Sequence, residues 1–138
     1  MRYLLVFIAI ILSSSCTCDR KPDSQNLLIV NNSKSNIYVF SSETDLLEVP
    51  YRTYSGIPPS DYQHKVGTAK NLFDRPNMWQ YSIDNSLGGV LRIFVVNQEL
   101  ADQYGWSTIF DRHLYSKVYI VNMDTLESHH WTITYTGK

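Results

Sequence analysis

Residues 90–96 read VLRIFVV and form the most hydrophobic run outside the N-terminus, and this run decides the fold. Both alternating faces of the run are apolar except at Arg92, which is typical of a strand in the interior of a sheet. A short helical pattern follows over residues 97–104. Asn97 is a good N-cap for that helix, and Gly105 suits the position just after its end.

Two further runs predict the strands that close the domain. Residues 115–121 alternate in character, and residues 131–135 read WTITY. Successive side chains of a strand point to opposite faces, so Trp131, Ile133 and Tyr135 should face the core while the two threonines face outward. The last strand is therefore expected to be half buried.

The start of the domain carries the pattern of a β-hairpin. Two apolar runs, 27–31 (LLIVN) and 36–40 (NIYVF), are separated by the turn residues NSKS. In the second run, Ile37 and Val39 would face one side of the strand, and Tyr38 and Phe40 would face the other. Residues 62–66 predict an edge strand that ends at Gly67.

Capping patterns indicate further short helices. Asn77 and Gln80 have capping-box spacing, and residues 124–127 (DTLE) repeat it. Trp79 and Ile83 would share one face of the first of these helices. The same segment also alternates in character, so a strand stays open as an alternative there. Ser107 is expected to cap one more helical turn.

The composition fits one globular domain. Apolar residues make up 43% of the 138 residues and charged residues 18%, and aromatic residues, which favour strands, make up 13%. We therefore expect a mainly-β fold over residues 27–138, a small antiparallel β-sandwich-like domain with one to three short helices. The formal net charge of −1, without a basic cluster, argues against a nucleic-acid partner.

The first fifteen residues predict a secretory leader. Arg2 precedes ten apolar residues, 3–12, which are too few to span a bilayer, and three serines follow. Cys16 comes directly after these serines, and this arrangement resembles the lipobox of bacterial lipoproteins, although Ser13 stands where leucine is usual. The resemblance implies that Cys16 is acylated and becomes the mature N-terminus. An ordinary signal peptide with two incidental cysteines is the alternative.

The cysteine count agrees with an anchor. Cys16 and Cys18 are the only cysteines, so no disulfide can join parts of the domain. Each acyl methylene that enters a membrane contributes about 0.8 kcal/mol, so several chains hold a protein firmly. Residues 16–26 then read as a polar tether. We expect a lipid-anchored protein at the outer membrane of a bacterial envelope, facing either the periplasm or the cell surface.

The C-terminal block resembles a family. An apolar strand leads to a short helix with Trp106 near its end, then Tyr115 and Tyr119 in a Tyr-x-x-x-Tyr motif, an acidic-Leu turn and a closing WTITY. This order is similar to that of short, uncharacterised envelope lipoproteins of the Bacteroidales, which also carry an Asn-x-Ser-type turn in an early hairpin. The resemblance implies a small β-rich lipoprotein and supplies no catalytic residues. The departure is Thr136, where a proline is more typical.

No pattern for an enzyme is present. The chain has no Gly-x-Ser-x-Gly elbow, its carboxylates are scattered singly, and its Gly-Gly pair precedes a strand, the reverse of a phosphate-binding loop. His129 and His130 are neighbours at a strand entrance and would point to opposite faces, whereas His64 and His113 could meet only through the fold. We therefore expect no catalysis, no metal and no cofactor.

Two hypotheses about function remain. The first is a non-enzymatic protein-interaction module that contacts an envelope protein. The second is a glycan or small-ligand binding module that uses loop aromatics as stacking surfaces. These aromatics belong largely to residues 41–69, where prolines and glycines break the pattern, and the alternative is that they cap the edge of the core. The candidate residues are Tyr51, Tyr54, Tyr62 and Trp79.

Overall fold

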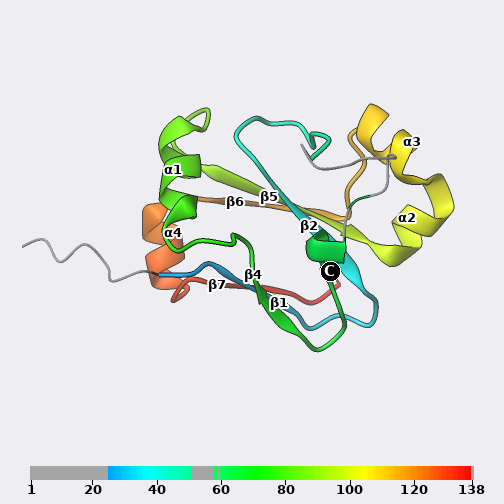
Figure 1. The fold of residues 1–138 in the computed structure, drawn as a ribbon, viewed down its shortest axis with the longest axis horizontal. Coiled ribbons are helices and arrows are strands. Elements are labelled where there is room, and N and C mark those ends of the chain that lie inside the picture. The colour runs from blue at the N-terminus through cyan, green and yellow to red at the C-terminus, as the bar shows by residue number, and fades with distance from the viewer. Residues whose placement is uncertain (1–24, 51–57, 59, 138) are drawn as a thin grey trace, which may run out of the picture.

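The computed structural model describes residues 25–50, 58 and 60–137, which form two β-sheets and several short helices (Figure 1). The first sheet has the strand order β4-β1-β7, with β1 (Leu28–Asn31), β4 (Ala69–Asn71) and β7 (Thr132–Tyr135). The second has the order β3-β2-β5-β6, with β2 (Ile37–Ser42), β3 (Gln63–His64), β5 (Leu91–Asn97) and β6 (Lys117–Val121). The helices are η1 (Ser60–Tyr62), α1 (Met78–Asn85), α2 (Gln98–Tyr104), α3 (Trp106–Asp111) and α4 (Met123–Ser128).

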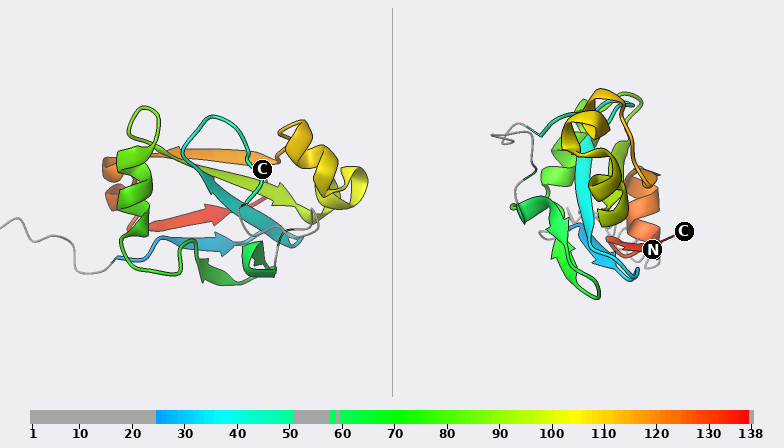
Figure 2. Two further views of the ribbon diagram at one scale, coloured as in Figure 1. Left: turned by 45° about the horizontal axis from the view of Figure 1, so that its top comes forward. Right: turned by 90° about the vertical axis from the view of Figure 1, so that its right-hand side faces the viewer.

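This arrangement confirms a mainly-β, sandwich-like domain. The described part of the chain holds four α-helices rather than one to three, partly because Gly105, at φ 71°, separates α2 from α3. One strand pair also departs from an all-antiparallel sandwich. Strands β1 and β7 run parallel, as their arrows show in Figure 2, because α4 returns the chain to the end at which β1 begins. No helix among the described residues is long and apolar enough to cross a membrane.

The predicted hairpin between the first two strands is wrong. Strand β1 pairs with β4 and β7, while β2 pairs with β3 and β5, so the chain passes from one sheet to the other between them. The reason lies in Asn31, whose side chain is fully buried. Its Nδ2 donates to the carbonyls of Ser35 (2.9 Å) and His64 (3.0 Å), and its Oδ1 accepts from the backbone N–H and the hydroxyl of Ser33. The turn therefore wraps around Asn31 instead of aligning two paired strands.

Strand β5 is buried on both faces, as predicted, because it separates two cores. The first core lies between the sheets and receives Leu91, Ile93 and Val95 from β5. Helices α1 and α4 contribute to this core from one end of the molecule (Figure 1). The second core lies on the outer face of β5 and packs against α2 and α3. Figure 2 shows these two helices at the opposite end of the molecule from α1 and α4.

Arg92 is the polar exception within β5, and the structure gives it partners. Its guanidinium forms an ion pair with the exposed Asp45, and its Nη1 donates to the Leu87 carbonyl at 3.0 Å. It stands opposite Ser42 at the end of β2, at the margin of the second core. A buried charge requires such partners.

The helix caps were predicted with mixed success. Asn97 caps α2 as expected, because its side chain accepts from the Leu100 N–H at 3.0 Å. Residues 78–85 form a helix and not a strand, but Asn77 makes no side-chain cap and adopts φ 62°. In α4 the cap is Asn122, two residues before the expected Asp124, and it accepts from the Thr125 N–H. Helix α3 begins directly after Gly105, so Ser107 does not cap it.

Candidate functional site

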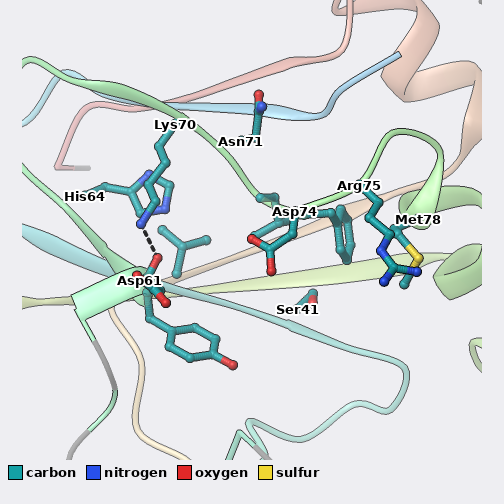
Figure 3. Close-up of a pocket in the computed structure, with 12 residues that line it drawn as sticks. Ser41, Asp61, His64, Lys70, Asn71, Asp74, Arg75 and Met78 are labelled. Carbon is teal, nitrogen blue, oxygen red and sulfur yellow. Dashed lines mark hydrogen bonds between the residues drawn. The ribbon is translucent and has the colours of Figure 1, made fainter. Parts of the chain in front are cut away.

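The two sheets of the sandwich leave a hollow on each side. On one side, a cleft of about 580 Å³ lies among β2, η1, β3, β4 and the segment that leads to α1 (Figure 3). On the other side, a groove of about 350 Å³ lies among β6, α4 and β7. The cleft is lined mainly by polar side chains and the groove mainly by apolar ones. Polar residues that line the cleft include Ser41, Asp61, His64, Lys70, Asp74 and Arg75.

His64 is the most unusual residue of the cleft. Strand β3 places it opposite Ile37, and only 2% of its surface is exposed. Burial and the nearby Lys70 ammonium lower the pKa of His64 to about 4, although a hydrogen bond to the Ile29 backbone acts in the opposite direction. The ring is therefore neutral at physiological pH. Its Nδ1 has no hydrogen-bond partner among the residues that the structure describes.

The charged residues of the cleft are balanced in sign. Figure 3 shows Asp61, His64 and Lys70 at one end and Arg75 at the other, with Asp74 between them. The Lys70 ammonium donates to the backbone carbonyl of Asp61, which ties β4 to η1. Two acidic and two basic side chains thus line the cleft, so it presents hydrogen-bonding groups without a net formal charge.

Ser41 lies at the floor of the cleft. It alternates with Ile37 and Val39 along β2, so it belongs to the face that forms the first core. Unlike those two residues it is exposed, because the cleft lies above it. Its hydroxyl is available at the floor of the cleft.

The groove on the opposite side is bridged by one hydrogen bond. The Tyr119 hydroxyl donates to the Thr134 carbonyl at 3.2 Å, which connects the edge of one sheet to the edge of the other. Burial raises the pKa of Tyr119, so the hydroxyl keeps its proton. Ile120, the next residue of β6, is 59% exposed beside this groove.

Of the predicted ligand-facing aromatics, the structure describes Tyr62 and Trp79, and these two are not brought together. Trp79 lies in the first core with 1% of its surface exposed, and its Nε1 donates to the Gln25 carbonyl at 2.9 Å. Tyr62 is half buried beside the cleft, and its ring stacks on Phe40 with a centroid distance of 5.2 Å. It therefore caps the edge of the second core, as the alternative reading expected. Tyr51, Tyr54 and Cys16 lie outside the described residues.

The histidines are not gathered into one cluster of metal ligands among the described residues. The ring of His129 contacts the Thr125 carbonyl within α4 at 2.8 Å, and the ring of His113 contacts the Leu47 carbonyl at 2.9 Å. In the described part of the chain, no three His, Cys, Asp or Glu side chains are placed to hold a metal ion.

Sequence reasoning missed most of the cleft. Of its residues, only His64 was a candidate from the sequence, as a metal ligand, and no pattern marked Ser41, Lys70, Asp74 or Arg75. Strand β4, which forms one wall, has only three residues and no apolar alternation, so no local pattern marked it. A histidine within the predicted edge strand of residues 62–66 was the one available signal.

Comparison of the chain with protein-family models, with curated proteins and with solved structures finds no match in any of the three.

Proposed function

We propose that this protein is a lipid-anchored, non-enzymatic interaction module of the bacterial envelope, and that a partner protein adds an extended segment to β6. The observation that carries the proposal is the outer edge of β6. This strand pairs with β5 alone and ends the four-stranded sheet, so one of its edges has no neighbouring strand among the described residues. Backbone groups along such an edge are a template for another strand.

The side chains of β6 favour an apolar partner segment. Four of its five residues are apolar or aromatic, and Lys117 at its start is the charged one. Ile120 is exposed beside the apolar groove under α4, where a side chain of an added strand could be buried. Backbone pairing would supply affinity, and the groove would select the partner residue.

The partner can be found and tested through Ile120. A photoreactive amino acid at position 120 in cells is expected to cross-link one short segment of an envelope protein, which mass spectrometry identifies. A synthetic peptide of that segment should bind the purified full chain and slow amide hydrogen exchange in β6. Ile120→Glu should weaken this binding about 10- to 100-fold, because a buried isoleucine contributes about 1.5–3 kcal/mol.

Leu87 provides the matched control, because it is 65% exposed on the turn that follows α1. A photoreactive residue at position 87 should not capture the same segment, and Leu87→Glu should leave peptide binding unchanged. Equal cross-linking from both positions would contradict the proposal. So would peptide binding that leaves exchange in β6 unaltered.

The anchor is tested separately from the partner. The short apolar leader, the three serines and the early cysteines of the sequence support acylation of Cys16. We expect Cys16→Ala to move the protein from the membrane fraction to the soluble fraction and to abolish labelling by a palmitate analogue. Cys18→Ala is the control and should remain labelled and membrane-bound. Labelling that persists in Cys16→Ala would show that the anchor lies elsewhere.

A further inference from the structure

We infer that the exposed face of α1 formed by Met78 and Tyr81, called here the α1 surface, contacts a bilayer of zwitterionic phospholipid. The inference rests on the proposed lipid anchor at Cys16 and is independent of strand addition at β6. It specifies which end of the domain faces the membrane, a property that an anchor alone leaves open.

The chain enters the domain beside the start of α1. The Gln25 carbonyl accepts hydrogen bonds from the backbone N–H of Asn77 (3.3 Å) and from Nε1 of Trp79 (2.9 Å). These two residues flank Met78, the first residue of α1. Figure 1 shows α1 and α4 at one end of the longest axis of the molecule, and α2 and α3 at the other. A chain that is anchored before Gln25 is therefore held at the α1 end.

The chain between the proposed anchor and the domain is short. Gln25 follows Cys16 by nine positions, and a fully extended chain of that length spans at most about 30 Å. A domain of this size has a radius of gyration of about 13 Å, so its two ends lie roughly 35 Å apart. The anchor therefore keeps the α1 end near the bilayer and disfavours a domain that stands on its α2–α3 end.

The side chains of α1 suit the boundary between lipid headgroups and acyl chains. The helix turns Trp79, Ser82 and Ile83 into the domain, whereas Met78 is 38% exposed and Tyr81 is 62% exposed. Residues three positions apart on a helix are neighbours, so these two exposed side chains form one surface. Methionine supplies an apolar side chain. Tyrosine supplies an apolar ring with a hydroxyl that stays in water, a combination that is enriched at membrane interfaces.

The charge of this end of the molecule selects the lipid. The exposed Arg75 precedes α1, but the exposed Asp74 and Asp84 stand before and within the helix. Helix α4, at the same end, adds the exposed Asp124 and Glu127. These carboxylates are repelled by the negative surface potential of anionic lipids. A zwitterionic surface carries no such net charge, so it is the favoured contact.

The test uses the full, membrane-anchored chain reconstituted in phosphatidylcholine vesicles. A photoreactive amino acid replaces Tyr81, and mass spectrometry measures its lipid adducts. The controls are Tyr104, 43% exposed on α2 at the other end, and Val66, 48% exposed on the turn between β3 and β4. We expect about fivefold more lipid capture from position 81 than from either control, because only the α1 surface would reach the headgroup region. Added phosphatidylglycerol should lower the capture from position 81.

Met78→Asp tests the chemistry of the α1 surface without unfolding the helix. An acidic side chain is favourable in the first turn of a helix, and α1 has none there, so the melting temperature should not fall. We expect lipid capture from position 81 to drop about threefold or more, since a carboxylate resists leaving water. Val66→Asp is the matched control and should leave this capture unchanged.

Retention on vesicles reports on the anchor, and lipid capture reports on the α1 surface. If vesicles fail to retain the unaltered chain, the anchor is wrong and the inference falls with it. Retention with equal lipid capture from positions 66, 81 and 104 would overturn the inference alone. Greater capture in the presence of phosphatidylglycerol would also overturn it, as would capture from position 81 that Met78→Asp leaves unaltered.

Discussion

Trp79→Ala is expected to lower the free energy of unfolding by about 3–5 kcal/mol, which is the usual cost of deleting a buried tryptophan side chain. The ring is 1% exposed in the first core, and its Nε1 hydrogen bond to Gln25 holds the segment before β1 against α1. The substitution would remove both the packing and this hydrogen bond. Urea unfolding followed by circular dichroism measures the change.

Tyr81→Ala is the control for Trp79, because it removes an aromatic ring from the same helix at a position that is 62% exposed. We expect a change within about 0.5 kcal/mol there. The Trp79 ring also lies 4.1 Å from that of Trp131 between ring centroids. Single and double alanine variants should therefore be non-additive by about 0.5–1.5 kcal/mol. A Trp79→Ala protein of unchanged stability would place this ring at the surface.

Asn31→Ala is the second substitution with a large expected effect, a loss of about 2–4 kcal/mol in unfolding free energy. The variant would leave the Ser35 and His64 carbonyls without their donor and the Ser33 N–H without its acceptor. Buried polar groups that lose their partners cost about 1–3 kcal/mol each, and water can compensate near the turn. Chemical denaturation of the variant measures the loss.

Two further variants test whether the loss of stability is specific to the Asn31 side chain. Asn32→Ala alters an exposed amide in the same turn and should change stability by less than about 0.5 kcal/mol. Asn31→Asp keeps the acceptor for Ser33 but removes the donor for the two carbonyls and adds a charge. It should be at least as destabilising as alanine. Similar values for Asn31→Ala and Asn32→Ala would mean that the passage between the sheets does not depend on Asn31.

Both hollows of the domain arise because neither sheet is closed. The edges at β6 and β7 surround an apolar groove, and the edges at β3 and β4 surround a polar cleft. An extended protein segment suits the apolar groove.

The residues around His64 show why the polar cleft was not predictable from the sequence. His64 and Asn31 are 33 positions apart in the sequence, yet the Asn31 side chain donates to the His64 carbonyl in the interior. Lys70 meets Asp61 only because β4 pairs with β1 while η1 leads into β3. No spacing rule connects these residues, and the burial of the His64 ring is a property of the assembled sheets.

The sequence by itself determined the longer strands, the helix after β5 and which side chains of those strands face inward, whereas it did not mark β4. Strand β5, the cap at Asn97, the break at Gly105 and the inward face of β7 all followed from local alternation and capping chemistry, which act between residues close in the chain. Only the tertiary structure decided that β1 and β2 enter different sheets, that β7 lies parallel to β1, and that Trp79 is a core residue. The backbone groups of all strands are chemically alike, so local sequence does not specify which strands pair. Long-range packing and the buried hydrogen bonds of Asn31 select the pairing partners of β1 and β2.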